Sequence, residues 1–386
     1  MVTVTYNIQL QMTESSFQYW YDFLVQARDA YNFCTQYVTD NNIPLGLKPI
    51  HEALYQRMRD RYTMLPAQAC VKVYKEALAA LRSIRSNKHK NAETPKRKQL
   101  ALRVDKRLYS DLTVEGIKLT GEERNKRKFY PFVKFDKMKE MFSTCKALDP
   151  LIFIRDGKIF LSVPFEAQEK PISSDISVGV DLGVKRLFVT SEGNAFKDEA
   201  YLREKRKIRY LKRCLQSKGT KSAKRHLKKM RKRERNLTKD MVNRACNALI
   251  QSTDASIIVL EDLSKIKTKT SKTKEGYNRK GHNRRLGQVP LYLFKEVMTY
   301  KAPLYGKKVE TVSPTWTSQT DCRSGKRDGN RIGCRYYCSD GVVLDADWNA
   351  SVNIAKRGNH PLSNDLPIDG GLSFLNGRGL SAPQSC

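Results

Sequence analysis

Three acidic residues stand at positions where an ionised carboxylate is costly to bury. Asp181 and Glu261 each close a short apolar run, and Asp347 falls in the first turn of a predicted helix. Three carboxylates that met at one point would repel one another, and a divalent cation removes that repulsion. Hard oxygen ligands with room for water suit Mg²⁺ or Mn²⁺. Two such ions would activate a water and stabilise a leaving oxygen, so the trio predicts phosphodiester hydrolysis.

Each acid taken alone also has a purely structural explanation. Asp181 precedes Leu-Gly and could cap a turn, and Glu261 could pair with a nearby Lys. Asp345 is expected to be the N-cap of the last helix, which leaves Asp347 facing inward. The order of strand Asp, strand Glu and helix Asp in a basic chain is more specific than any one of its members.

The charge of the chain predicts a polyanionic partner. The 386 residues include 72 Lys and Arg against 40 Asp and Glu, a formal net charge of +32. Nucleic acid is the default partner, and an anionic membrane surface is the weaker alternative. Residues 203–235 contain 17 Lys and Arg against two Glu, a net +15, with a thin apolar stripe broken at Gly219. This pattern predicts a helical hairpin with a basic outer face, and binding that weakens steeply with salt.

Two further basic runs, 86–98 and 265–285, have no apolar period and are predicted to be loops. One basic run could be a solvated face, but three runs and the overall excess favour nucleic-acid contacts. The candidate contact residues are Lys205, Arg206, Lys207, Arg209, Lys212, Arg213, Lys224, Arg225, Lys228, Lys229, Arg231, Lys232, Arg284 and Arg285.

Composition excludes several other classes of protein. No run of 18 apolar residues is present, which excludes a membrane span. The N-terminus lacks the basic region and apolar core of a secretory signal. Nine cysteines, an odd number and mostly isolated, fit a reducing compartment and predict a cytoplasmic protein.

Periodicity predicts β structure interrupted by helices, and then an α/β unit. Residues 2–10 alternate as a strand, helical spacing follows over 14–39 and 67–84, and 151–163 reads as a hairpin. From residue 176 the elements alternate, with a buried strand at 256–264 that holds Glu261. Tyr292 and Trp348 are expected in the core because both have helical spacing.

Four motifs carry a resemblance to a known family. DLG at 181–183, LED at 260–262, TSQT at 317–320 and DADWNASVNI at 345–354 resemble the RuvC-type nuclease domain of TnpB proteins. These proteins are compact RNA-guided DNA endonucleases, encoded by transposons and related to the type V CRISPR effectors. The resemblance covers residues 171–357, whereas the N-terminal third is similar only in layout.

The resemblance implies an α/β plus α+β multidomain fold. In it an RNase H-like (RuvC) nuclease domain follows an N-terminal β-barrel-like wedge domain interrupted by a helical bundle. Asp181, Glu261 and Asp347 would be the catalytic residues and the Mg²⁺ ligands. The implied partners are a guide RNA from the transposon end and double-stranded DNA with a short adjacent motif, bound by a protein monomer. The implied domains are wedge 1–13 and 107–170, helical 14–106, nuclease 171–312 and 344–358, ribbon-like 313–343 and disordered tail 359–386.

The cysteines depart from the family's four-cysteine zinc ribbon. Only Cys322, Cys334 and Cys338 remain, and Ser324 and Asp340 stand where two further cysteines are expected. Because a structural zinc site needs four ligands, we expect a ribbon without metal. Packing of three residues is expected to hold it: Tyr336, Tyr337 and Val342.

Two other functions stay open on the sequence alone. A catalytically silent RNA-guided DNA-binding protein would share the charge, although nothing would then maintain the acids. A RuvC-like strand-transfer or resolving enzyme would use the same acids and would need no RNA.

Overall fold

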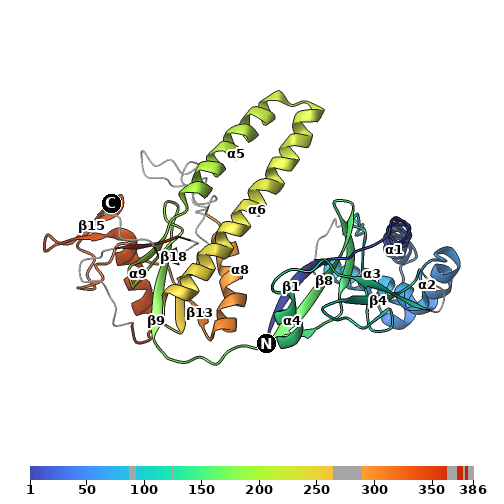
Figure 1. Cartoon of the computed structure of the whole chain (residues 1–386). Coiled ribbons are helices and arrows are strands. Elements are labelled where there is room, and N and C mark those ends of the chain that lie inside the picture. Colours follow the sequence, from blue (N-terminus) through green and yellow to red (C-terminus); the bar gives the residue numbers. More distant parts are fainter. Residues whose placement is uncertain (87–92, 123–125, 264–288, 363–371, 377–378, 381–386) are drawn as a thin grey trace. The chain divides into compact units, whose positions relative to one another are not determined.

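The computed structural model describes residues 1–386 except 87–92, 123–125, 264–288, 363–371, 377–378 and 381–386. The chain divides into two compact units, unit 1 (Met1–Gln168) and unit 2 (Glu169–Cys386) (Figure 1). Each has its own hydrophobic core.

Unit 1 is built on a sheet in which long strands meet across a tight hairpin. The sheet order is β1-β8-β7-β2, with β6 paired to β8. Asp156 and Gly157, both at positive φ, form the turn between β7 and β8, as the sequence predicts. A second, three-stranded sheet (β3, β4, β5) and the short helix α4 complete the β part. The bounds are β1 Val2–Gln9, β2 Ala101–Arg103, β3 Tyr109–Ser110, β4 Gly116–Thr120, β5 Arg127–Pro131, α4 Met138–Thr144, β6 Lys146–Ala147, β7 Leu151–Arg155 and β8 Lys158–Ala167.

Three helices share the core of unit 1 with these strands. They are α1 (Glu14–Asp40), α2 (Leu47–Arg61) and α3 (Ala67–Ser86). The predicted bundle over 14–106 is too long, because β2 already pairs with β7 in the sheet. A three-residue strand is too short to show a period of two, so sequence pattern alone misses it. One continuous core joins Trp20 and Phe23 of α1 to Tyr130 of β5.

Unit 2 centres on a mixed sheet of order β13-β12-β9-β10-β11-β17-β18. Its middle strands, β9 and β12, are parallel, and β13 is parallel to β12, whereas β10 runs antiparallel to β9. The bounds are β9 Ser177–Leu182, β10 Phe188–Thr190, β11 Asn194–Phe196, β12 Ile257–Glu261, β13 Lys308–Val312, β17 Ser373–Asn376 and β18 Gly379–Leu380.

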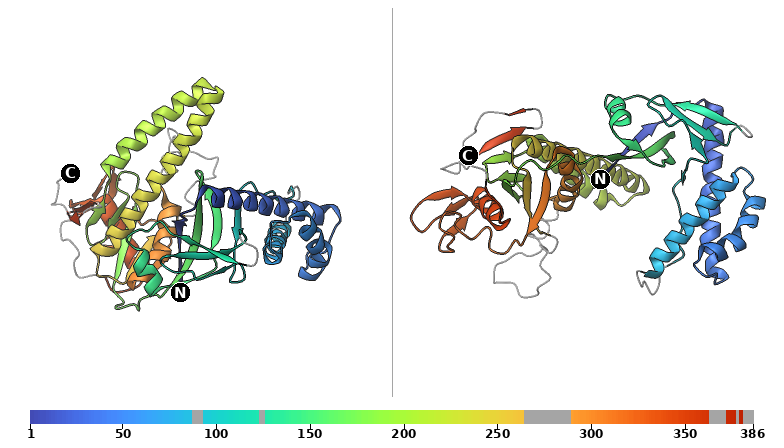
Figure 2. Two further views of the ribbon diagram at one scale, coloured as in Figure 1. Left: turned by 45° about the vertical axis from the view of Figure 1, so that its right-hand side comes forward. Right: turned by 90° about the horizontal axis from the view of Figure 1, so that it is seen from below.

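Helices cover both faces of this sheet (Figure 2). On one face α6 (Lys221–Ser252) and α8 (Leu291–Lys301) pack on Val178, Val180 and Ile258. On the other, α9 (Ala346–Arg357) packs through Ile354 and its neighbours. The strands are therefore buried on both sides, which explains their continuous apolar runs.

The basic run 203–235 forms the predicted helical hairpin. Helix α5 (Glu199–Lys218) ends at Gly219, which has a left-handed φ of 63°, and α6 begins at Lys221. Ion pairs join the two helices, Lys212 to Glu234 at 2.6 Å and Arg233 to Glu204 at 2.6 Å. Helix α6 continues without a break to Ser252. Figure 1 shows the hairpin leaving the sheet.

Part of the predicted disordered tail is a strand. β17 pairs in parallel with β11 and extends the sheet of unit 2. Leu375 is buried and packs in the same core as β9 and β12. The Gly, Pro, Ser and Asn content of the tail hides this strand, because burial of a single apolar side chain on an existing sheet suffices to hold four residues.

Candidate active site

The register of the sheet places two of the acids at one edge. Val180 of β9 lies beside Leu260 of β12 in a parallel pair. The next residues, Asp181 and Glu261, therefore leave the same edge on strands that lie about 4.8 Å apart. Both side chains are only partly exposed. The prediction that each acid lies in a mainly buried strand is confirmed: Asp181 is the last residue but one of β9, and Glu261 is the last residue of β12.

The third acid reaches this edge because α9 lies unusually close to β9. Gly179 permits the approach, since a Cβ there would stand 2.0 Å from the carbonyl oxygen of Ser351. Asp345 caps the helix and accepts hydrogen bonds from the backbone N–H groups of Asp347 and Trp348. Asp347 thus occupies the first turn, as predicted, with its side chain 17% exposed.

The charges of the three acids act on one another. Burial, and then the nearby carboxylates of Asp347 and Glu261, raise the pKa of Asp181 to about 8. Burial also raises the pKa of Glu261, against the opposing hydrogen bond from Thr317 and the positive charges of two arginines. The structure therefore brings Asp181, Glu261 and Asp347 within electrostatic reach of one another.

Two arginines hold Asp347, and the sequence analysis did not anticipate either. Arg186 donates from Nε to Asp347 Oδ2 at 3.0 Å and grips Asp345 through two further bonds of 2.8 and 3.0 Å. Arg331 donates to Asp347 Oδ1 at 2.7 Å. Burial lowers the pKa of Arg186, but the bonds and charges of the two aspartates outweigh it and raise the pKa. Both cations compensate the negative charge of Asp347.

The TSQT segment positions Glu261 and is itself held by α9. The Thr317 hydroxyl donates to Glu261 Oε1. Asn353 donates to the carbonyl oxygens of Thr317 and Thr320 at 3.0 and 2.7 Å, and Asn349 donates to Thr320 O at 2.7 Å. Asn349 and Asn353 are one turn apart on a buried helix face. That spacing of amides among apolar residues is the sequence signal that could have revealed them.

The three carboxylates are ligands of the kind that a hard cation binds, although they do not lie close enough together to form a complete metal site. Among the described residues, no three His, Cys, Asp or Glu side chains lie close enough together to hold an ion. Three carboxylates are nevertheless the oxygen ligands that Mg²⁺ prefers. Burial and then the repulsion of the neighbouring carboxylates raise the pKa of Asp181, and a bound cation would offset both effects. Arg186 and Arg331 already offset part of the negative charge at Asp347.

Comparison with known proteins finds two matching family models and a curated relative. Residues 160–272 match a family model described as a probable transposase, and residues 292–354 match the Cas12f1-like TNB domain. The chain is 25% identical over 271 residues to the protein named "Putative RNA-guided DNA endonuclease InsQ" of Escherichia coli (strain K12). That alignment covers 64% of this chain and 66% of the relative. These matches confirm the resemblance to the TnpB family.

Two further relatives extend the comparison. Over 82 residues, the chain is 38% identical to the CRISPR-associated endodeoxyribonuclease Cas12f2 of Micrarchaeota archaeon (strain CG1_02_47_40), covering 17% of this chain and 14% of the relative. The chain thus spans less than two thirds of either curated relative. A Cas12f1 structure, solved as a complex with sgRNA and target DNA, superposes with a TM-score of 0.59 at 13% identity. It covers 89% of this chain and 83% of that one, which establishes a shared mixed α/β fold.

The cysteine segment, residues 313–343, carries ion pairs beside its three cysteines. Cys322 and Cys338 are buried, whereas Cys334 is exposed. Arg323 pairs with Asp321 at 3.2 Å and with Asp340 at 2.8 Å. The segment contributes the short strands β14 (Asn330–Ile332) and β15 (Arg335–Tyr337), which pair with β16 (Val343–Asp345).

Two expectations about packing are wrong. Of the three residues predicted to hold the cysteine segment, only Tyr336 is buried, and Tyr337 and Val342 are 37% and 41% exposed. Successive residues of a short strand face opposite sides, so only one neighbour can point inward. Trp348 lies in the core as predicted, but Tyr292 is 81% exposed because it falls on the outer face of α8.

The predicted nucleic-acid contacts lie almost entirely on the α5–α6 hairpin. Lys205 and Lys212 are half-buried, and the other ten candidates on these helices are exposed. Arg284 and Arg285, with the whole basic run 265–285, lie outside the described residues. None of the helices in the described part of the chain combines the length and apolar character that a membrane crossing requires.

Proposed function

We propose that this chain is an RNA-guided DNA endonuclease that hydrolyses phosphodiester bonds at Asp181, Glu261 and Asp347 with bound Mg²⁺. The observation that carries the proposal is the carboxylate of Asp181, whose pKa is raised to about 8 by burial and then by the nearby charges of Asp347 and Glu261. Burying like charges together is costly unless a cation or a chemical role compensates it. A mixed sheet, covered by helices on both faces and holding acids at one edge, supports an RNase H-like (RuvC) fold for unit 2.

The residues around the acids have distinct roles in this proposal. Asp181, Glu261 and Asp347 would hold Mg²⁺, which supplies an activated water and neutralises charge on the phosphate. Thr317 keeps the Glu261 carboxylate oriented through its hydroxyl. Arg331, whose side chain is 34% exposed, can turn from Asp347 towards the phosphate. Arg186, at 9%, stays with Asp345 and fixes the start of α9.

The partners in this proposal follow from charge and from the relatives. The exposed cations of the α5–α6 hairpin fit the phosphates of an RNA or of an RNA–DNA heteroduplex, which carry no sequence information by themselves. Relatives are named as RNA-guided or CRISPR-associated nucleases. We therefore infer a guide RNA from the transposon end and a DNA target with a short adjacent motif. Unit 1 would read that motif, in a wedge of strands and a helical part, and one protein chain would serve each RNA.

Cleavage by the purified complex tests the proposal. Protein that carries its co-purified RNA should cut matched double-stranded DNA in Mg²⁺, and Asp181→Ala and Glu261→Ala should abolish cutting while binding persists in a gel-shift assay. Cys334→Ser, on the exposed cysteine, is the control and should cut normally. Normal cutting by both acid variants would end the proposal.

The same assay separates the alternatives. Wild-type binding without any Mg²⁺-dependent cutting would favour a silent DNA-binding protein. Activity that survives RNase treatment of the complex would favour a strand-transfer or resolving enzyme.

A further inference from the structure

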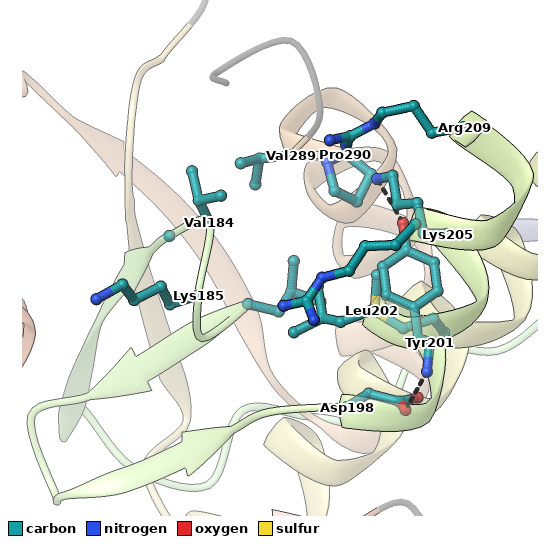
Figure 3. A pocket seen from close by; sticks show the side chains of 13 residues that line it. Val184, Lys185, Asp198, Tyr201, Leu202, Lys205, Arg209, Val289 and Pro290 are labelled. Atoms are coloured by element: carbon teal, nitrogen blue, oxygen red, sulfur yellow. Dashed lines mark hydrogen bonds between the residues drawn. The ribbon is translucent and has the colours of Figure 1, made fainter. Parts of the chain in front are cut away.

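A pocket opens beside the loop that follows Asp181 (Figure 3). Its volume is about 230 Å³. Its walls come from the β9–β10 loop, the first half of α5, Met241 of α6 and the residues just before α8. Figure 3 shows Val184 and Lys185 of the loop on one side and Lys205 and Arg209 of α5 on the other. No part of the proposed catalytic site lines this pocket.

The pocket has apolar walls and a cationic rim. The apolar side chains are Val184, Leu187, Leu202, Met241, Val289 and Pro290. Four cations join them: Lys185, Lys205, Arg206 and Arg209. The amine of Lys205 is held at the wall by the Tyr201 hydroxyl, at 2.7 Å. The lining acid, Asp198, is already engaged, because it accepts from the Tyr201 N–H at 2.8 Å and from Arg244 at 2.7 Å.

The pocket and the acid site lie on two sides of one short loop. Arg186 of that loop contacts Asp347, and the next residue, Leu187, lines the pocket. Consecutive Cα atoms are about 3.8 Å apart. A ligand in the pocket is therefore a close neighbour of the acids.

This combination points to a nucleotide. A free phosphate would not need six apolar side chains, and an apolar ligand would not need four cations. The cavity is smaller than the ~300–1,000 Å³ of pockets for drug-sized ligands, which suits one flat ring better than a larger molecule. Bases that are taken out of a stack are commonly received by an apolar pocket while cations track the backbone.

We propose that the pocket receives one unpaired nucleotide of the DNA strand presented to Asp181, Glu261 and Asp347. The base lies against Leu187, Leu202 and Met241, and the flanking phosphates lie on the cations of the rim. The proposal rests on the proposed function, because it assigns the ligand to the strand that is cut. It favours DNA over guide RNA because the pocket adjoins the acids and not the outer face of the hairpin.

A binding experiment without metal tests the pocket separately from cleavage. The probe is a single-stranded oligodeoxynucleotide, bound in EDTA by the protein with its RNA, and a series of probes carries one abasic site at each successive position. Wild type should show one position where the abasic site weakens binding about 5- to 150-fold. Leu202→Phe fills the pocket and should abolish that dependence.

Matched variants complete the experiment. Arg206→Glu, on the rim, should weaken every probe while keeping the sensitive position, and Lys218→Glu, the same charge change at the end of α5, should leave the profile across positions unchanged. Thermal unfolding of each variant checks that it is folded. A profile that is flat in wild type, or identical in Leu202→Phe and wild type, overturns the proposal. An RNA probe of the same sequence that binds as tightly with the same sensitive position overturns the assignment to DNA. None of these outcomes depends on cutting, so a failed cleavage assay leaves this result interpretable.

Discussion

The acid site and the cysteine segment both carry side chains of metal-ligand type, but they are built on different scaffolds. The acids leave the ends of β9 and β12 and the first turn of α9, all anchored in buried elements. The cysteines lie in and around short strands with much exposed surface, and Asp321, Arg323 and Asp340 form their own network there. Asp181 is strained electrostatically by its acid neighbours, whereas Asp321 is satisfied by Arg323.

The contrast teaches which scaffold can force like charges together. Parallel strands fix the spacing of Asp181 and Glu261, and a close helix adds Asp347, so the side chains have little freedom to separate. A small sheet with exposed edges has no such rigidity, and oppositely charged residues can assemble within it. The energetic consequences of substitution should therefore differ between the two regions.

The largest expected effect comes from Gly179→Ala in the acid site. A Cβ at this position would lie 2.0 Å from Ser351 O and 2.5 Å from Ala355 N, and these are backbone atoms that cannot rotate away. Overpacking of this kind displaces α9 and with it Asp345 and Asp347. We expect a loss of about 5 kcal/mol or more in the free energy of unfolding, measured by urea denaturation.

The matched change in the cysteine segment is Gly333→Ala. Gly333 has a left-handed φ, 63°, and nothing lies within 4 Å of a Cβ there. Only backbone strain of roughly 1–2 kcal/mol should follow. Equal losses in the two variants would contradict the proposed difference in scaffold.

Removal of Arg186 should have the next largest effect. Arg186→Met leaves Asp345 and Asp347 without their buried partner, so metal-free protein should lose about 3 kcal/mol of stability. Mg²⁺ should restore part of this loss, because it compensates the same charge. The readout is the change in Tm on adding Mg²⁺, which should be larger in the variant than in wild type.

Arg323→Met is the control for Arg186→Met in the cysteine segment. It uncovers Asp321, which is 2% exposed, and Asp340. Its Tm should fall by less, and Mg²⁺ should not restore it. If Mg²⁺ raised the Tm of Arg323→Met and not that of Arg186→Met, the region that needs a cation would be the cysteine segment, and the expectation for the acid site would be wrong.

Much of the acid site could be predicted from the sequence because it follows from long, regular elements. The apolar runs before Asp181 and Glu261 indicated buried strands, and Asp345 indicated a helix start. Arg186 and Arg331 could not be predicted, because Arg186 comes from a short loop and Arg331 from the three-residue strand β14, and the direction of both depends on tertiary packing.

Secondary structure was missed for the same reason. Strands β2 and β17 are three and four residues long, below the length at which alternation is visible. Tyr292 has the spacing of a core residue, but α8 buries only its other face. The sequence pattern thus predicted the long elements and missed the short strands, which form by pairing with a strand of an existing sheet.

The pH dependence of stability should be opposite in sign for an acid of each region. The pKa of Asp181 is about 8 in the folded protein and about 3.8 when unfolded, so the folded state binds more protons between these values. Stability of metal-free protein should therefore fall as pH rises from about 4 to about 8. Asp181→Asn should flatten this slope and raise Tm at pH 8 by several °C.

Asp321→Asn provides the comparison. Burial opposes ionisation of Asp321, but bonds from the Arg323 backbone and guanidinium prevail and lower its pKa. Ionised Asp321 therefore stabilises the folded protein above the pKa of the unfolded state, and this stabilisation is lost as pH falls. The variant should be less stable than wild type at pH 8. Tm values measured from pH 4 to 9 in EDTA test this contrast. If Asp181→Asn and Asp321→Asn changed Tm at pH 8 in the same direction, the contrast would be refuted.

The smallest effect should come from the cysteines themselves. Cys334 is exposed and Cys322 and Cys338 are buried as apolar side chains, with burial raising the pKa of both buried thiols. A protonated thiol is a poor ligand for zinc, because the metal binds the thiolate. We expect Cys334→Ser to change the free energy of unfolding by less than about 0.5 kcal/mol. A zinc-selective chelator should leave Tm unchanged. Stoichiometric zinc in the purified protein, together with a Tm that falls on chelation, would show instead that the segment binds zinc.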